Sequence, residues 1–334
     1  MIVLLEELTK VFGPSGNEER IRAKIIDEIR PYADSITVDK LGNLIATKIG
    51  PGEKLMLAAH MDEIGVIITN ADEKGFLRFS NVGGVSPFTL IGQRVFFANG
   101  ITGVFGMEKI DDIKDLKLNK MFIDIGAKSK EKALEKINIG EMGVYNRQFS
   151  DAGDHIISNS LDDRAGCAVL IKVLKELKAP NYNIFVVFTV QEEVGLRGAK
   201  TSAYGLEPDL AIAVDVTDTG DTPEASEMAV ELGKGPAIKI KDSSVICHPK
   251  VKKALIDAAA RRNIPFQLEV LEKGGTDTGA IHLTRSGVPS GALSIPTRYI
   301  HTPTEMANLN DIEQGIQLLI ELIEGREQQI ILYN

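Results

Sequence analysis

An alternation of strand-like and helix-like segments constrains the fold of this chain more than any other feature of its sequence. Near the start, apolar residues recur at helical spacing and are followed by three β-rich runs, SITVD, NLIATKIG and KLMLAAH. After residue 160 the alternation returns, with helices predicted at 165–178, 250–262 and 311–325 and apolar strands between them. This pattern predicts an α/β fold, in which a mostly parallel or mixed sheet is flanked by helices.

Two helices are predicted before the first β-rich run. Leu5 and Leu8 share one face of the first helix, and isoleucines recur every four residues over 21–29 in the second. Ser15 and Glu18 stand at the spacing of a capping box, in which the two side chains bind backbone N–H groups at a helix start. We therefore expect Ser15 and Glu18 to begin the second helix.

The segment from 67 to 155 has a different pattern. Its strand-like runs are short and are separated by Gly, Asn and Asp, and within it only 128–137 is predicted to be helical. Such a pattern is typical of a small β-barrel or sandwich. At 334 residues the chain is long enough for two domains. We therefore expect an α/β domain formed by 1–66 plus 156–334, with an inserted β domain at 67–155.

Composition excludes several classes of protein. The chain carries 38 Lys and Arg against 47 Asp and Glu, and it has no dense basic stretch, which argues against nucleic-acid binding. Two cysteines are too few for a disulfide framework, and no apolar run approaches the roughly 20 residues that span a bilayer. The first residues include Glu6 and Glu7 but no basic region, unlike a signal peptide. We expect a cytoplasmic protein without nucleic-acid or membrane partners.

Several predicted strands run directly into residues that can bind a metal ion. Four apolar runs end in such residues, which are His60 with Asp62, Glu192 with Glu193, Asp215, and His301. A fifth segment, SLDDRAG, places Asp162 and Asp163 just before a predicted helix. In open α/β sheets, ligands bind beyond the carboxyl ends of the strands. All five segments can therefore converge on one rim of the sheet.

This convergence is an electrostatic argument for bound cations. Four or five carboxylates in one cleft raise one another's pKa values unless cations neutralise them. Imidazole and carboxylate ligands without thiolate suit Zn, Co or Mn. Two histidines and three carboxylates exceed a single tetrahedral shell, and paired metal ions are a common device for hydrolysis. Two divalent ions are therefore expected.

Each segment also has a purely structural interpretation when it is taken alone. A His-x-Asp pair can form a hydrogen-bonded turn, adjacent glutamates are usually solvated, and acids before a helix oppose its dipole. The joint occurrence of all five segments favours the metal site. The loop at 274–279 is either part of a pocket or a glycine turn with a helix cap, and its candidates for substrate binding are Gly275, Thr276 and Asp277.

The motifs AAHMDEIG, SLDDRAG, TVQEEVGLRGA, AVDV, GGTDTGAIH and IPTRYIHTPTEM closely resemble those of a family of di-metal aminopeptidases. This family includes the tetrahedral (TET), glutamyl and deblocking aminopeptidases, and some of its members are labelled endoglucanase M. The resemblance covers essentially the whole chain and implies a zinc-exopeptidase-like fold. It also implies that the β insertion makes dimer contacts, from which a particle of twelve subunits is built.

The resemblance further implies a role for each candidate residue. One ion would be bound by His60 and Asp215 and the other by Glu193 and His301, with Asp162 as the bridge. Glu192 would be the general base that takes a proton from the attacking water. Asp62 would hold the imidazole of His60 in its metal-binding tautomer. Two Zn or Co ions per subunit are expected, with Mn as a further possibility, and peptides are the expected substrates.

Three other functions stay open at this point. A related di-metal deacylase or carboxypeptidase would use the same metal core. An endoglucanase would need two carboxyl groups and no obligatory metal, and this chain has no Trp for sugar stacking. A non-catalytic assembly or metal-storage protein is the remaining alternative. The preferred N-terminal residue of a peptide substrate is not predictable from the sequence.

Overall fold

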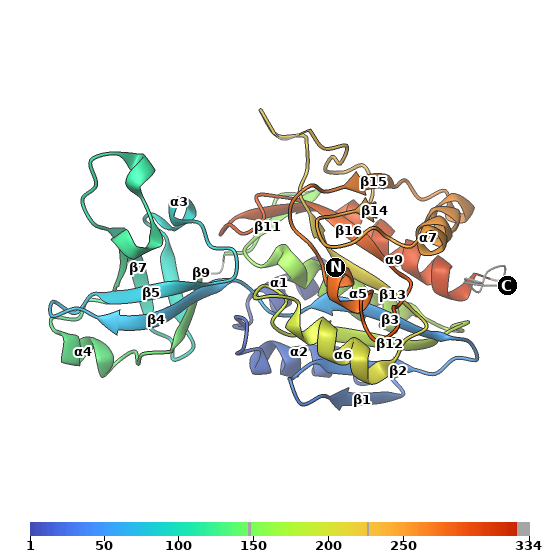
Figure 1. Ribbon diagram of the computed structural model, residues 1–334, viewed down its shortest axis with the longest axis horizontal. Coiled ribbons are helices and arrows are strands. Elements are labelled where there is room, and N and C mark those ends of the chain that lie inside the picture. Colours follow the sequence, from blue (N-terminus) through green and yellow to red (C-terminus); the bar gives the residue numbers. More distant parts are fainter. Residues whose placement is uncertain (146–147, 226, 326–334) are drawn as a thin grey trace.

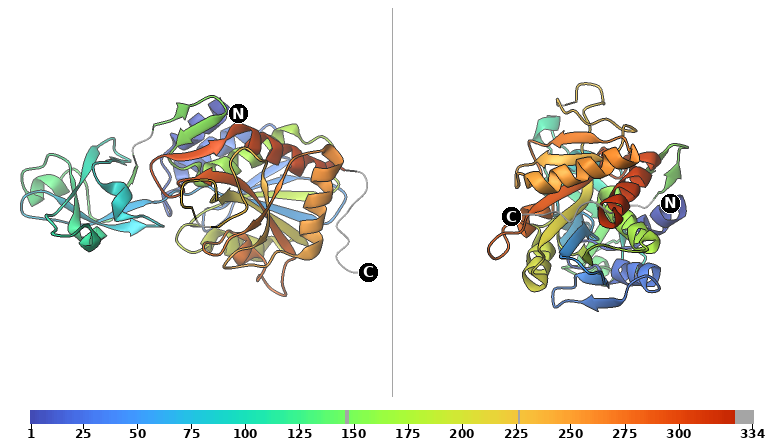
Figure 2. Two further views of the ribbon diagram at one scale, coloured as in Figure 1. Left: turned by 90° about the horizontal axis from the view of Figure 1, so that it is seen from above. Right: turned by 90° about the vertical axis from the view of Figure 1, so that its right-hand side faces the viewer.

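The protein has two lobes of unequal size (Figure 1). The computed structural model describes residues 1–145, 148–225 and 227–325. The larger lobe contains a mixed sheet with helices on both faces, and the smaller lobe is a β-barrel that projects from it. The view from above in Figure 2 separates the two lobes along the long axis of the molecule.

The helices of the described chain are α1 Ile2–Thr9, α2 Glu19–Ile29, α3 Pro87–Leu90, α4 Lys130–Leu134, α5 Leu161–Glu176, α6 Arg197–Leu206, α7 Pro249–Arg262, α8 Thr278–Ile281 and α9 Leu309–Glu324, with the 3₁₀ turns η1 Ile113–Asp115 and η2 Leu118–Lys120. The strands are β1 Ser35–Val38, β2 Leu44–Lys48, β3 Lys54–His60, β4 Gly65–Ala71, β5 Leu77–Val82, β6 Arg94–Phe97, β7 Thr102–Met107, β8 Met121–Asp124, β9 Met142–Tyr145, β10 Ser150–Asp151, β11 His155–Ser158, β12 Asn183–Thr189, β13 Leu210–Thr217, β14 Ala237–Lys241, β15 Gln267–Val270, β16 Ser290–Arg298 and β17 Glu305–Asn308.

The large sheet confirms the predicted mixed α/β fold. Its main strand order is β1-β2-β12-β3-β13-β16-β17-β11-β10, and β14 with β15 branches from β16. The four central strands β12, β3, β13 and β16 are mutually parallel, whereas the outer pairs of the main order are antiparallel. Because the central strands are parallel, they end at the same edge of the sheet, where the candidate residues follow them. Parallel strands are normally covered on both faces.

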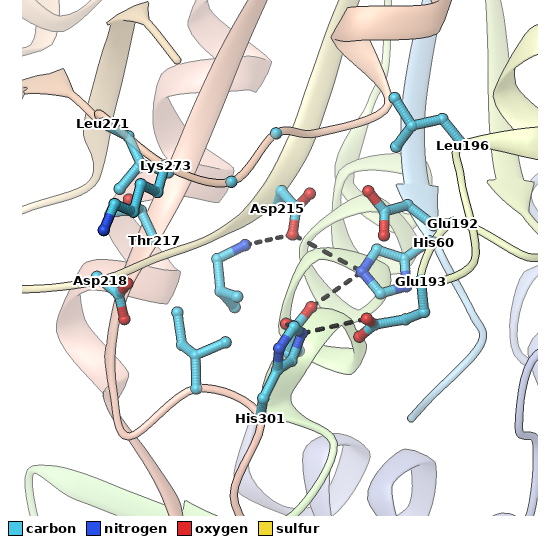
Figure 3. Close-up of a pocket in the computed structure, with 15 residues that line it drawn as sticks. His60, Glu192, Glu193, Leu196, Asp215, Thr217, Asp218, Leu271, Lys273 and His301 are labelled. Atoms are coloured by element: carbon cyan, nitrogen blue, oxygen red, sulfur yellow. Dashed lines mark hydrogen bonds and ion pairs between the residues drawn. The ribbon is translucent and has the colours of Figure 1, made fainter. Parts of the chain in front are cut away.

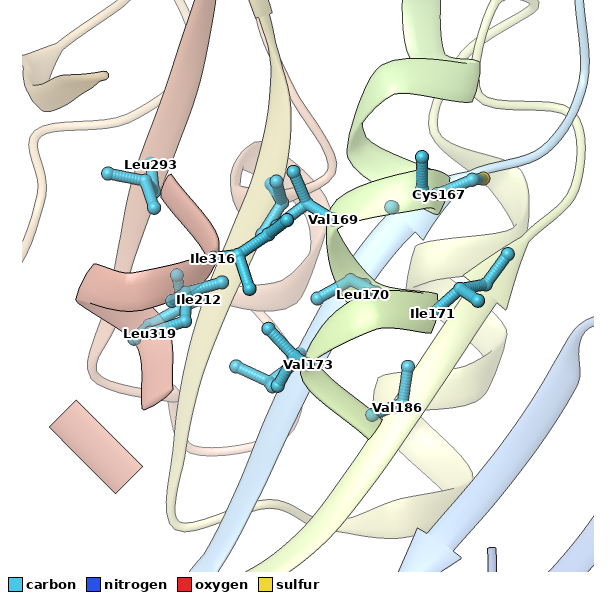
Figure 4. Packing of buried hydrophobic residues seen from close by; sticks show 14 of the residues in the cluster. Cys167, Val169, Leu170, Ile171, Val173, Val186, Ile212, Leu293, Ile316 and Leu319 are labelled. Carbon is cyan, nitrogen blue, oxygen red and sulfur yellow. The ribbon is translucent and has the colours of Figure 1, made fainter. Parts of the chain in front are cut away.

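Alternate side chains of β3 explain why helices cover both faces of the sheet. Leu55 and Leu57 belong to the main core with α1, α2, α5, α7 and α9, whereas Met56 and Ala58 belong to a second core with α6 and α8. In Figure 4, Leu170 of α5 lies among the side chains of this main core. The side chain of Cys167 is fully buried in this core.

The smaller lobe is a closed barrel with strand order β4-β5-β8-β7-β6-β9. It has its own buried core, and its strands lie within 65–145. Strand β10 pairs with β11, which pairs with β17 in the large sheet. The residues at 150–155 therefore pair with the larger lobe, although we placed them in the inserted segment. The division into domains at 67 and 155 stays a prediction.

The predicted capping box is wrong. Helix α2 begins at Glu19, and the Glu18 side chain makes no capping hydrogen bond. The Ser15 hydroxyl donates instead to Asp62 Oδ2 (2.6 Å), and Glu18 Oε1 accepts from the N–H of Gly16 (2.6 Å). The tertiary bond of Ser15 to Asp62 and the local bond of Glu18 to Gly16 replace the expected capping bonds.

In the described part of the chain, no helix has the length and apolarity to cross a membrane.

Candidate metal centre and catalytic cavity

The candidate ligands meet where the parallel strands end (Figure 3). His60 is the last residue of β3, Asp215 lies near the end of β13, and His301 follows β16. Glu193 lies in the turn between β12 and α6, and Asp162 lies at the start of α5 with a cis peptide bond to Asp163. Five separate segments therefore supply the five predicted ligands, because the parallel register brings their ends to one edge.

Asp162 lies between the two imidazoles. Its Oδ1 is 2.9 Å from His60 Nε2, and its Oδ2 is 3.2 Å from His301 Nε2. His60 Nε2 is also 3.8 Å from Asp215 Oδ1, and His301 Nε2 is 3.1 Å from Glu193 Oε2. Two groups able to hold a metal ion result, one of His60, Asp162 and Asp215 and one of Asp162, Glu193 and His301. The shared carboxylate is the residue predicted to bridge.

The pKa shifts show how strongly charge is concentrated in this cluster. Burial alone would lower the pKa of His60, but its hydrogen bonds to Asp162 and Asp62 raise it well above its usual value. Burial would also lower the pKa of His301, but its hydrogen bonds to Asp162 and Glu193 raise that pKa to about 12. Burial and the charge of Asp162 raise the pKa of Asp215, even though His60 lowers it. The cluster thus attracts positive charge, as a cation site does.

Asp62 connects the imidazole to the loop that carries the glutamates. Its carboxylate is fully buried, and Oδ1 lies 3.5 Å from His60 Nδ1. Oδ1 also accepts from the N–H of Glu192 (3.0 Å), and Oδ2 accepts from the N–H of Glu193 (3.3 Å). The sequence predicted the contact with His60 but not the two bonds to the glutamate loop.

Glu305 is a supporting residue that the sequence did not single out. Its side chain is 2% exposed, and its two oxygens accept from the N–H groups of Asp162 (3.0 Å) and His301 (2.9 Å). It therefore fixes the backbone of two candidate ligands at once. The available signal was its position four residues after His301 in a motif of the resemblance. Asp163, which follows Asp162, accepts a hydrogen bond from the N–H of His60 (3.2 Å).

A cavity of about 510 Å³ opens beside the cluster. Its wall includes the candidate ligands and Glu192, together with Leu196, Thr217, Asp218, Leu271, Lys273, Gly274, Gly275 and Ile300.

Of the three substrate-binding candidates, Gly275 lines this cavity. Thr276 and Asp277 are buried and do not line it, and Asp277 accepts a hydrogen bond from the Thr189 hydroxyl (2.5 Å). Burial raises the pKa of Asp277 to about 6. Asp277 therefore supports the end of β12 from behind the cavity wall.

The sequence model of the M42 glutamyl aminopeptidase family matches residues 42–318, which is most of the chain. This chain belongs to the M42 aminopeptidase family. The match spans the candidate ligands, from His60 to His301, as well as the β-barrel. The resemblance found in the motifs is confirmed, and the chain is a hydrolase of the peptidase class.

Individual relatives agree with the family match. A putative aminopeptidase of Acetivibrio thermocellus is 58% identical, over 97% of this chain and 98% of its own. The structure of an aminopeptidase from Desulfurococcus kamchatkensis is 39% identical with a TM-score of 0.94, over 97% of this chain and 94% of its own. The TET1 peptidase of Pyrococcus horikoshii is 37% identical with a TM-score of 0.86, over 96% and 98% of the two chains. The predicted fold is therefore confirmed along nearly the whole chain.

Replacing Glu305 tests whether it positions the ligands. We expect Glu305→Ala to lower the zinc affinity of the metal-stripped protein about 10- to 100-fold, because the backbones of Asp162 and His301 lose their common acceptor. Competition with a chromogenic chelator measures the affinity. Glu313→Ala, which removes an exposed glutamate from α9, is the control. An affinity of Glu305→Ala within twofold of the wild-type value would contradict this role.

Proposed function

We propose that this chain is a metal-dependent aminopeptidase in which two divalent ions and Glu192 hydrolyse the bond after the N-terminal residue of a peptide. The observation that supports this proposal most directly is the position of Asp162, whose two oxygens face two different imidazoles at 2.9 and 3.2 Å. A carboxylate in that position suits two cations on opposite sides of it. The adjoining cavity of about 510 Å³ has room for the end of a peptide.

The donor atoms fit such ions. Both imidazoles turn Nε2 toward carboxylate oxygens, and the other ring nitrogen of His60 lies 3.2 Å from the backbone oxygen of Asp62. A proton on Nδ1 that is shared with this oxygen leaves Nε2 as the ligand atom. His60 and Asp215 are proposed for one ion, Glu193 and His301 for the other, and Asp162 for both. Zn or Co is the proposed metal, and Mn also suits these donors.

Glu192 is the proposed general base. It lines the cavity beside Glu193 but belongs to neither of the two candidate metal groups. Bound divalent ions would supply Lewis acidity, which lowers the pKa of a coordinated water and polarises the scissile carbonyl. The Glu192 carboxylate would accept the proton of the attacking water and deliver it to the leaving amine. Asp62 holds the N–H of Glu192 and so orients this carboxylate.

The alternative functions have less support. An endoglucanase needs its two carboxyl groups free to flank a glycosidic bond, whereas here Asp162 and Glu193 lie against imidazoles. A deacylase or carboxypeptidase would share the metal core, but the family match favours an aminopeptidase. The cavity presents charges of both signs to the N-terminal residue of a substrate, because Asp218 and Lys273 both line it.

Replacing Glu192 by glutamine tests its role as general base separately from the binding of the metal ions. We expect Glu192→Gln to lower kcat on aminoacyl substrates about 10²- to 10⁴-fold, because an amide cannot accept the proton. Elemental analysis should find the same metal content as in the wild type. Glu313→Gln, on the exposed face of α9, is the control. If Glu192→Gln keeps its metal and more than a few per cent of its activity, Glu192 is not the base.

We also propose that the chain forms a homo-oligomer through its β-barrel. The related TET1 peptidase of Pyrococcus horikoshii can assemble into a tetrahedron or a large octahedral shell. Large apolar side chains are exposed on the barrel lobe, among them Phe88 (58%), Ile113 (54%) and Ile139 (60%). These side chains are available for contacts between subunits. The cytoplasm stays the proposed location, and the two buried, unpaired cysteines suit a reducing compartment.

Light scattering tests this assembly. For a tetrahedral dodecamer we expect a single species of about twelve times the 36.3 kDa mass of the chain. The expectation follows from burial of exposed apolar side chains of the barrel, such as Phe88, in contacts between subunits. Phe88→Asp should reduce the mass, whereas Val3→Asp, at an exposed position of α1 (67%), should not. A monodisperse monomer or dimer of the wild-type chain would contradict the dodecamer.

A further inference from the structure

The segment from Gly13 to Glu18 lies against the loop that follows His60 and the loop that carries Glu192, and the proposed reaction gives it no role. The N–H of Ser15 donates to the backbone oxygen of Glu63 (3.3 Å), and the N–H of Glu63 donates to that of Gly13 (3.0 Å). The N–H of Gly13 also donates to Glu63 Oε1 (2.9 Å). The segment is therefore bound to the chain that follows His60, before helix α2 begins.

Ser15 contacts the carboxylate that holds the glutamate loop. Its hydroxyl donates to Asp62 Oδ2 at 2.6 Å, and the Ser15 side chain is almost fully buried. The same Asp62 carboxylate accepts from the N–H groups of Glu192 and Glu193. A buried carboxylate with several donors has little freedom to rotate. The Ser15 hydroxyl therefore fixes the acceptor to which the glutamate loop is attached.

Glu18 holds the same loop one residue earlier. Its Oε1 accepts from the N–H of Gln191 (3.2 Å) as well as from that of Gly16. Gln191 has a φ of 54°, in the left-handed region that residues with a Cβ rarely adopt. A bond to its N–H therefore stabilises a backbone turn that is unfavourable by itself. The turn determines where the next two side chains point.

Three successive N–H groups, at Gln191, Glu192 and Glu193, are thus held by two buried carboxylates that the 13–18 segment supplies or orients. We propose that Ser15 and Glu18 are positioning residues, which aim the Glu192 carboxylate at the reacting water and Glu193 at its metal ion. This inference rests on the proposed function, because it gives Glu192 and Glu193 the roles described above. Neither Ser15 nor Glu18 lines the cavity, so both act through the loop.

Alanine and conservative variants separate positioning from simple stability. We expect Ser15→Ala and Glu18→Ala to lower kcat about 10- to 100-fold, with KM within about twofold. Glu18→Gln keeps a carbonyl oxygen that can accept from both N–H groups, so its kcat should stay within about threefold of the wild type. Ser290→Ala is the matched control, because Ser290 is also buried and donates to Val288 O at the far end of β16.

The visible spectrum of the cobalt(II)-loaded protein gives a readout apart from activity. The d–d bands of cobalt depend on ligand geometry, so they should change in Ser15→Ala and Glu18→Ala but not in Glu18→Gln or Ser290→Ala. Thermal unfolding of each loaded variant shows whether it is folded. The proposal is overturned if both alanine variants keep kcat within twofold, or if their bands are unchanged, or if Glu18→Gln loses as much activity as Glu18→Ala.

The spectra also separate this proposal from the proposed function. If Glu192→Gln stays fully active, the assignment of the base fails, yet altered cobalt bands in Ser15→Ala would still support the positioning of Glu193. If Glu192→Gln is inactive while Ser15→Ala and Glu18→Ala behave like the wild type, the proposed function stands and the positioning role fails.

Discussion

The contact of Asp162 with both imidazoles is the interaction on which the rest of the site depends. Two carboxylates about 4 Å apart repel by roughly 4 kcal/mol at an effective dielectric constant of 20, and proteins are stable by only about 5–15 kcal/mol. Asp162, Glu193 and Asp215 therefore need positive charge between them. The hydrogen bonds of His60 and His301 to carboxylates of the cluster raise the pKa of both imidazoles, as expected where positive charge is favoured. Two divalent ions, bound by the neutral imidazoles and these carboxylates, would supply that charge.

The fold explains how these groups are brought together and held there. Parallel strands β12, β3, β13 and β16 end at one edge, and their buried apolar side chains fix the strand ends in place. Behind the ligands, Asp62, Glu305 and Asp163 each accept backbone N–H groups of ligand-bearing segments. These carboxylates orient the ligands without lining the cavity. The geometry of the site therefore depends on the residues behind the ligands as well as on the ligands themselves.

The sequence predicted the fold class and the residues that would meet, because both follow from local patterns. Apolar runs indicate the buried strands, and the polar residues that end these runs, such as His60 and Glu192, indicate one edge of a parallel sheet. Tertiary contacts were harder to predict. Ser15 and Glu18 have the spacing of a capping box, yet their partners Asp62 and Gln191 lie 47 and 173 residues away. Glu305 was missed for the same reason, since its partner Asp162 is 143 residues distant.

A crystal structure of the zinc-loaded protein, with anomalous difference maps recorded at the zinc edge, tests the central claim most directly. The account predicts two peaks per chain, about 3.5–4 Å apart. One peak should contact His60 and Asp215 and the other Glu193 and His301, and each should contact one oxygen of Asp162. A single peak, or two peaks of which one does not contact Asp162, would contradict the account.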